Sequence, residues 1–154
     1  MKIAEFLNEK AVSANLKATN KEGVIRELVE LLAKAEGMKN KEELVKVLLG
    51  RESLGSTGIG QGVGIPHGKS DAVKKLVGAF GICHQGLNFD ALDGEPVYIF
   101  FLLVAPEDSA GPHLKGLARI SRLLKDKFFR ESLKTLTDEK AIFKLIREED
   151  AKRP

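Results

Sequence analysis

The segment VYIFFLLVA, residues 97–105, constrains the fold most, because all of its side chains are hydrophobic. It is too short to cross a bilayer as a helix, which takes about 20 residues. A strand with one solvated face alternates apolar and polar side chains, and this segment does not alternate. We therefore predict a central strand that is buried on both of its faces.

Helical periodicity marks four further segments, which are residues 19–37, 40–53, 111–126 and 137–150. Residues that commonly flank helices stand at their ends. We expect N-caps at Thr19 (with Glu22 in a capping box), at Asn40, and at Thr137 or Asp138, and a C-cap at Gly37. In the helix over 111–126 we expect Pro112 in the first turn and a buried stripe of Leu114, Leu117, Ala118 and Leu124.

A second strand is expected over KLVGAFGICH, residues 75–84. Helices that flank a few strands indicate an α/β fold with a central, mixed sheet. The 154 residues suit one domain, and no internal boundary divides them. We predict a single domain over residues 1–150 and a frayed tail at 151–154. Phe128 and Phe129 are expected to pack the C-terminal helices.

Composition narrows the classes of partner and compartment. The net charge is +3, with no block of Lys or Arg, so nucleic acid is not expected as a partner. The start, MKIAEFLNEK, lacks the apolar core of a signal peptide, and no segment is long enough for direct membrane insertion. The single cysteine, Cys83, excludes an internal disulfide. These features predict a cytoplasmic protein, in which we interpret Cys83 and His84 as structural.

The segment GSTGIGQGVGIPHGKS, residues 55–70, holds six of the 15 glycines. The P-loop pattern G-x-x-x-x-G-K-[ST] misses by one residue, because valine occupies position 63. The segment contains neither the dinucleotide pattern G-x-G-x-x-G nor the serine-hydrolase pattern G-x-S-x-G. The three histidines stand far apart in sequence and make no metal motif, so no metal or other cofactor is indicated.

His67 is the candidate nucleophile of this segment. Pro66 restricts the backbone before it, and Gly64 and Gly68 leave space around the ring. The glycine run allows backbone N–H groups to turn inward as an anion-binding nest. Much imidazole is unprotonated near neutral pH, which makes it a good nucleophile. We interpret His67 as the acceptor of a phosphoryl group, although a lone loop histidine is more often a solvated or structural residue.

Other residues are candidates for binding the phosphoryl oxygens. His113 lies at the start of a predicted helix, where free N–H groups favour anions. Arg51 can bind phosphate through two N–H groups. The alternatives are a polar helix-start residue for His113, a solvated charge for Arg51 and a turn residue for Thr57. The expected phosphoryl-binding loop consists of Thr57, Gly58, Gly60 and Gly62, and the expected apolar rim for a protein donor consists of Leu54, Ile59 and Val63.

The segment ESLGSTGIGQGVGIPHG, residues 52–68, resembles the signature of enzyme IIA domains of the phosphoenolpyruvate-dependent phosphotransferase system, fructose/mannitol type. Glu52 opens that signature, Ile59 and Gly60 continue it, and residues 63–68 close it as apolar–small–apolar–Pro–His–Gly. Gly64 stands where the family usually has alanine. The order of elements is similar over nearly the whole chain, including the helix over 111–126 that carries the family's second active-site histidine.

The resemblance implies a mixed sheet of about five strands with helices on both faces. It implies that His67 is phosphorylated at Nε2 and that His113 and Arg51 line the site, with no cofactor. The donor would be the phosphohistidine form of the phosphocarrier protein HPr or of its nitrogen-branch counterpart.

Two functions fit the resemblance. In one, the chain is a nitrogen-regulatory IIA protein that binds target proteins according to its phosphorylation. In the other, it is a stand-alone sugar-transport component that passes the phosphoryl group to an enzyme IIB. The residues 51–69 are more similar to the nitrogen-regulatory branch. A binding domain without phosphorylation is a weaker alternative, because His67, His113 and Arg51 are all present.

Overall fold

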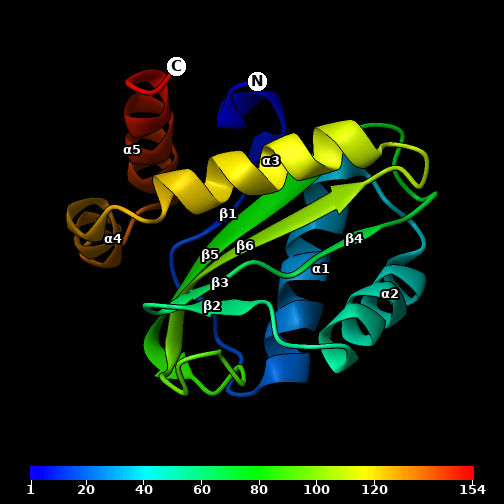
Figure 1. Cartoon of the computed structure of the whole chain (residues 1–154), viewed down its shortest axis with the longest axis horizontal. Coiled ribbons are helices and arrows are strands. Elements are labelled where there is room, and N and C mark those ends of the chain that lie inside the picture. Colours follow the sequence, from blue (N-terminus) through cyan, green and yellow to red (C-terminus); the bar gives the residue numbers. More distant parts are fainter.

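The computed structural model describes residues 1–154 and has one mixed sheet at its centre (Figure 1). The strands are β1 (Leu7–Ser13), β2 (Gly58–Gly60), β3 (Val63–Gly64), β4 (His67–Lys69), β5 (Val77–Leu87) and β6 (Val97–Ala105). Their order is β1-β5-β6-β3-β2, and β4 also pairs with β6. Because β5 is antiparallel to β6 while β3 and β4 are parallel to it, the predicted mixed sheet of about five strands is confirmed, with β4 as a short addition.

Helices cover both faces of the sheet (Figure 1). They are α1 (Lys21–Glu36), α2 (Lys41–Ser53), α3 (Ala110–Leu123), α4 (Lys127–Lys134) and α5 (Glu139–Ala151), with a short 3₁₀ helix η1 (Ile3–Glu5). The buried side chains form two clusters of equal size, one shared with α1 and α2 and the other with α3, α4 and α5. Alternate residues of β6 enter the two clusters, so its expected burial on both faces is confirmed.

Most helix ends lie where the sequence predicts them, with one correction. Asn20, rather than Thr19, caps α1, because its side chain accepts the N–H of Gly23 at 2.7 Å. Gly37 ends α1 in the left-handed conformation, as expected. Of the two candidate N-caps of α5, Thr137 and Asp138, it is Asp138 that caps the helix. No helix combines the length and the apolar character that a membrane span needs.

The buried face of α3 differs from the predicted stripe. Leu114 is 67% exposed and Ala118 is also exposed, whereas Leu124 is buried as expected. The buried residues of α3 are His113, Gly116, Arg119, Ile120 and Leu123. Hydrophobic periodicity misses this face because a histidine, a glycine and an arginine occupy it.

One expectation for the C-terminal region also needs correction. Phe129 packs in the core as predicted, but Phe128 is 83% exposed. At the end of the chain, α5 continues to Ala151, and the carbonyl oxygens of Arg153 and Pro154 accept hydrogen bonds from Arg119. A buried guanidinium needs acceptors, and these carbonyl groups provide them.

Candidate functional site

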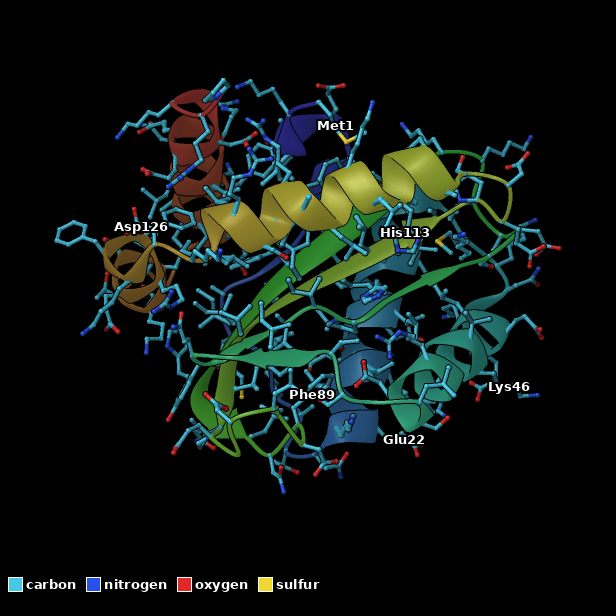
Figure 2. All side chains as sticks on the ribbon, viewed as in Figure 1. Met1, Glu22, Lys46, Phe89, His113 and Asp126 are labelled. Carbon is cyan, nitrogen blue, oxygen red and sulfur yellow. The ribbon has the colours of Figure 1, made fainter.

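His67 and His113, which are far apart in sequence, meet in the folded chain. Their ring centroids lie 5.4 Å apart with an interplanar angle of 89°. His67 begins β4 and pairs with Leu103 of β6. Figure 2 shows the His113 side chain between α3 and the sheet, and only 6% of this residue is exposed. The structure thus brings together the two histidines that the sequence singles out.

Two glycines allow the close packing around this pair. At Gly116, a Cβ atom would lie 2.9 Å from Leu76 Cδ2 and 3.2 Å from Leu103 Cδ2. The absence of a side chain there lets α3 approach β6 beside the partner of His67. Residues three apart share one face of a helix, so this approach also brings His113 to the sheet. At Gly68, a Cβ atom would lie 3.0 Å from Val47 of α2, so β4 packs directly against that helix.

A backbone contact determines which nitrogen of His67 is free. Its Nδ1 atom lies 2.7 Å from the carbonyl oxygen of Ile65. A carbonyl oxygen only accepts hydrogen bonds, so Nδ1 carries the proton in this contact and Nε2 has the lone pair. The ring is half-buried, and burial is the main cause that lowers the pKa of His67. The neutral, nucleophilic form of the ring is therefore favoured near neutral pH.

Arg51 lies in the last turn of α2 and acts on His67 electrostatically. Its Nη1 atom donates to the carbonyl oxygen of Gly55 at 2.8 Å. The positive charge of Arg51 adds to the effect of burial and lowers the pKa of His67, whereas the negative charge of Glu52 opposes it. Thus the two neighbouring charges at the end of α2 influence the same ring in opposite directions.

Glu52 holds the chain segment that follows α2. It is only 7% exposed, and it accepts hydrogen bonds from both the N–H group and the hydroxyl group of Thr57. Lys21 pairs with the same carboxylate at 3.1 Å. The Thr57 hydroxyl is therefore directed at Glu52. The sequence motif includes Glu52 but does not reveal this role, and Lys21 carries no sequence signal for it.

The residues of the expected phosphoryl-binding loop, Thr57, Gly58, Gly60 and Gly62, lie in a β-hairpin of β2 and β3 or directly next to it. Gln61 and Gly62 form its turn with φ values of 59° and 78°, and two consecutive positive values are those of a type I′ turn. The N–H group of Gly58 donates to Ser56 Oγ at 3.0 Å, and that of Gln61 to Asp93 at 2.9 Å. These donors are already used within the chain.

The turn of the hairpin lies away from the histidines, whereas Thr57, just before the hairpin, lies beside the segment that leads to His67, because its carbonyl oxygen accepts the N–H of Ile65 at 3.0 Å. Val63 of the hairpin pairs with Ile99, whereas His67 pairs with Leu103. At the usual rise of a strand, these positions are about 13 Å apart along β6. Gly58 is needed for packing, because a Cβ atom there would lie 2.9 Å from the backbone of Ala91. The glycine-rich segment therefore builds a tight hairpin, and its last part delivers His67.

His113 has an unsatisfied polar atom. Its Nδ1 is buried and has no hydrogen-bond partner. Burial is the main cause that lowers the pKa of His113, and the charges of His67 and Lys69 lower it further. Lys69 comes two residues after His67 in β4, and sequence reasoning did not identify it as part of the site. A neutral ring with an unpaired nitrogen at the start of α3 is suited to donate to an anion.

Exposed apolar side chains follow the site residues in the chain. Leu54 is 85% exposed just beyond α2, and Leu114 is 67% exposed next to His113. Ile59 is partly exposed, as an apolar rim requires, but Val63 is buried in the core. Val63 is therefore removed from the predicted rim, and Leu114 replaces it.

The remaining chemistry-bearing residues lie elsewhere. Cys83 is buried in β5, and burial raises the pKa of its thiol. His84 Nε2 lies 2.8 Å from the carbonyl oxygen of Ala14. No group of three or more His, Cys, Asp or Glu side chains is placed to hold a metal ion. Cys83 and His84 thus have structural surroundings, and neither joins the pair of His67 and His113.

Comparison with known proteins identifies the family. The family model described as "Phosphoenolpyruvate-dependent sugar phosphotransferase system, EIIA 2" matches residues 5–149. A nitrogen regulatory protein of Bradyrhizobium diazoefficiens is 38% identical over 95% of each chain. The fructose-specific EIIABC component of Bacillus subtilis is 37% identical over 97% of this chain, which spans 24% of that protein.

A solved structure has the same fold. The nitrogen regulatory protein IIA-Ntr of Neisseria meningitidis superimposes with a TM-score of 0.85 at 34% identity, covering 94% of this chain and 98% of the other. Sequence and fold agree over nearly the whole length, so the chain belongs to the EIIA 2 family of the phosphoenolpyruvate-dependent sugar phosphotransferase system.

Proposed function

We propose that the chain is a phosphocarrier that accepts a phosphoryl group on Nε2 of His67, and that it acts as a nitrogen-regulatory IIA protein. The observation that carries the proposal is the contact of His67 Nδ1 with the Ile65 carbonyl oxygen, because it leaves Nε2 as the nucleophile. The donor is the phosphohistidine of HPr or of its nitrogen-branch counterpart. In the transfer, the N–P bond to the donor breaks, a new N–P bond to Nε2 forms, and the donor ring keeps the electron pair.

The neighbours of His67 suit the charge on the transferred group. Phosphoryl transfer needs in-line positioning and neutralisation of the equatorial oxygens. His113 offers a buried nitrogen without a partner, and Arg51 offers a guanidinium whose charge reaches His67. The Thr57 to Gly62 segment contributes by shape, since its hairpin and its bonds to Glu52 hold the chain between Arg51 and His67. Residues of the chain thus provide preorganised donors at the site.

A protein donor requires a surface as well as a nucleophile. Leu54 and Leu114 are exposed beside Arg51 and His113, respectively. Exposed apolar side chains next to a polar site favour a protein partner. Relay partners must separate after each transfer, which suits a small, transient interface. We infer that the donor's phosphohistidine reaches His67 between these two leucines.

The regulatory assignment draws on the nitrogen regulatory relatives, one of which matches along 95% of both chains. Transfer to an enzyme IIB in sugar uptake is the second candidate, because the fructose-specific relative is almost equally identical. The regulator is expected to bind target proteins in only one phosphorylation state. The transport component is expected to lose its phosphoryl group rapidly to a IIB protein.

Intact-mass measurement tests the phosphocarrier role. The protein is mixed with phosphoenolpyruvate, enzyme I and HPr, or with the nitrogen-branch equivalents, and analysed under alkaline conditions. We expect a gain of one phosphate that is lost in acid and is absent in His67→Ala. His84→Ala is the matched control, because this histidine lies outside the site, and it should gain the phosphate normally. Normal labelling of His67→Ala would refute the assignment.

A second measurement separates the two branches. The protein and its His67→Ala variant are used as baits in native lysate, with and without prior phosphorylation. Recovery of kinases or channels that depends on phosphorylation supports regulation. Recovery of an enzyme IIB, together with rapid loss of label to it, supports transport instead.

A further inference from the structure

A buried arginine ties α3 to the C-terminal end of the chain. Arg119 is only 8% exposed, and its Nε atom donates to a carboxylate oxygen of Asp150 at 2.6 Å. Its two terminal nitrogens donate to backbone carbonyl oxygens of Asp150 (3.0 Å), Arg153 (3.0 Å) and Pro154 (2.6 Å). One guanidinium thus makes four directional hydrogen bonds, and all of its acceptors belong to the C-terminal segment.

The N-terminus joins the same cluster. The second carboxylate oxygen of Asp150 accepts the N–H of Ile3 at 2.6 Å. Lys2 Nζ donates to the carbonyl oxygens of Asp150 and Arg153. Figure 1 shows the N-terminal segment, the end of α5 and α3 near one another. We call Arg119, Asp150 and the carbonyl groups of residues 150, 153 and 154 the α3 latch.

The latch lies on the helix that carries His113. Arg119 and His113 are about 9 Å apart along the axis of α3. We treat a helix of this length as a rigid element. Between them, Gly116 presents only backbone to Leu76 and Leu103. Ile120 and Leu123 of α3 also pack in the core, and apolar packing is less directional than hydrogen bonding. The four bonds of Arg119 are directional, so they restrict both the axial position and the rotation of α3.

We propose that Arg119 is a positioning residue for the His67–His113 pair, acting through α3 and held by the C-terminal segment. Its effect on phosphoryl transfer rests on the proposed function, but its effect on the placement of His113 does not. A buried ion pair is weak support for stability by itself, whereas its geometry specifies one arrangement. Without the latch, the N-terminal turn of α3 departs from the sheet and His113 becomes more exposed.

The first test is NMR titration of the three histidine rings in the full-length protein. Burial keeps the pKa of His113 low, and His67 and Lys69 are the charged groups that lower it further. Loss of the latch therefore raises the pKa of His113 toward its ordinary value. Arg119→Ala and Asp150→Asn are the informative variants, and Arg119→Lys keeps the charge if Arg119→Ala does not fold.

These variants separate positioning from direct electrostatics. Removing the positive charge of Arg119 would by itself raise the pKa of His113, and removing the negative charge of Asp150 would by itself lower it. Displacement of His113 from its buried position raises its pKa in both variants. A rise in both supports the proposal, and shifts of opposite sign, or no shift in Asp150→Asn, overturn it. Leu133→Ala removes a fully buried side chain of α4 without touching the latch, and it should leave the titration unchanged.

The second test is phosphoryl transfer from the phosphocarrier. Displacement of a positioning group by about 1 Å can cost about 100-fold in rate. We expect Arg119→Ala to lower kcat by about 10- to 100-fold, with KM nearly unchanged and partial rescue in Arg119→Lys. Equal rates in Arg119→Ala and Leu133→Ala contradict the role in transfer. If the wild-type protein accepts no phosphoryl group, the proposed function fails, and the titration still decides whether Arg119 positions His113.

Discussion

The Nδ1 atom of His67 donates to the carbonyl oxygen of Ile65, only two residues earlier in the chain, at 2.7 Å. Pro66 lies between them and limits the backbone to conformations in which such a short loop can close. The contact assigns the proton to Nδ1 and leaves the lone pair on Nε2. The candidate nucleophilic atom is therefore set locally, within the Ile-Pro-His segment, while the candidate assisting residues Arg51 and His113 come from α2 and α3.

Replacing His113 should slow phosphoryl transfer, but His67 should remain the residue that is phosphorylated. His113→Gln keeps a polar side chain but removes the ring whose nitrogen is buried without a partner. Loss of one preorganised donor typically costs about 100-fold in rate. We expect that loss in rapid-quench measurements, with the label still on His67 by peptide mapping. Label found on His113 in the wild-type protein would reverse the two roles.

The charges at the end of α2 should shift the titration of His67 in opposite directions. The positive charge of Arg51 lowers the pKa of His67, so Arg51→Gln should raise it. The negative charge of Glu52 has the reverse effect, so Glu52→Gln should lower it. NMR titration of the His67 ring measures the pKa in both variants. Shifts of the same sign would show that the mutations act by altering burial.

Gly58 should prove to be a packing residue. A Cβ atom at this position would lie 2.9 Å from the Ala91 backbone, which cannot move as a flexible side chain can. We expect Gly58→Ala to lower the free energy of unfolding by about 1–3 kcal/mol in urea titrations, with transfer per folded molecule unchanged. Gly50→Ala is the control, because open space surrounds this helical glycine. Alanine at this position should raise the free energy of unfolding by at most about 1 kcal/mol. A loss of transfer without a loss of stability would instead support a phosphoryl-binding role for Gly58.

Stability should fall as the pH drops below the ordinary histidine value. The pKa values of His67 and His113 are lowered in the folded chain, from an ordinary value of 6.5. Well above pH 6.5 both rings are neutral in both states, and the full stability is present. As the pH falls through 6.5, the unfolded chain binds protons first, so stability decreases until the folded rings also titrate. Urea unfolding at several pH values measures this slope, which the double variant His67→Gln/His113→Gln should reduce.

Several features of the fold follow from short stretches of sequence. The hydrophobic run over β6 predicts a strand buried on both faces, and Gly37 and Asp138 predict helix ends, because each depends on neighbours within a few residues. The same holds for His67, whose proline and glycines are adjacent in the chain. The cap of α1 was misplaced by one residue, since Thr19 and Asn20 are both good caps and only the folded backbone chooses between them.

The α3 helix shows where sequence reasoning fails. Its buried face contains His113, Gly116 and Arg119, which a search for hydrophobic periodicity places on the solvent side. Each is buried for a tertiary reason: His113 meets His67, Gly116 approaches the sheet, and Arg119 binds the C-terminal segment. Likewise, the sequence does not show that the Thr57 hydroxyl donates to Glu52.

By itself, the sequence determined the family signature and the α/β class and singled out His67 as the candidate phosphoryl acceptor, because these depend on residues that are neighbours in the chain. Only the tertiary structure decided that His113 stands 5.4 Å from His67, that the glycine segment is a hairpin, and that Arg119 holds the chain ends to α3. Such contacts join residues distant in sequence, so they depend on how the helices pack against the sheet, which no local pattern encodes.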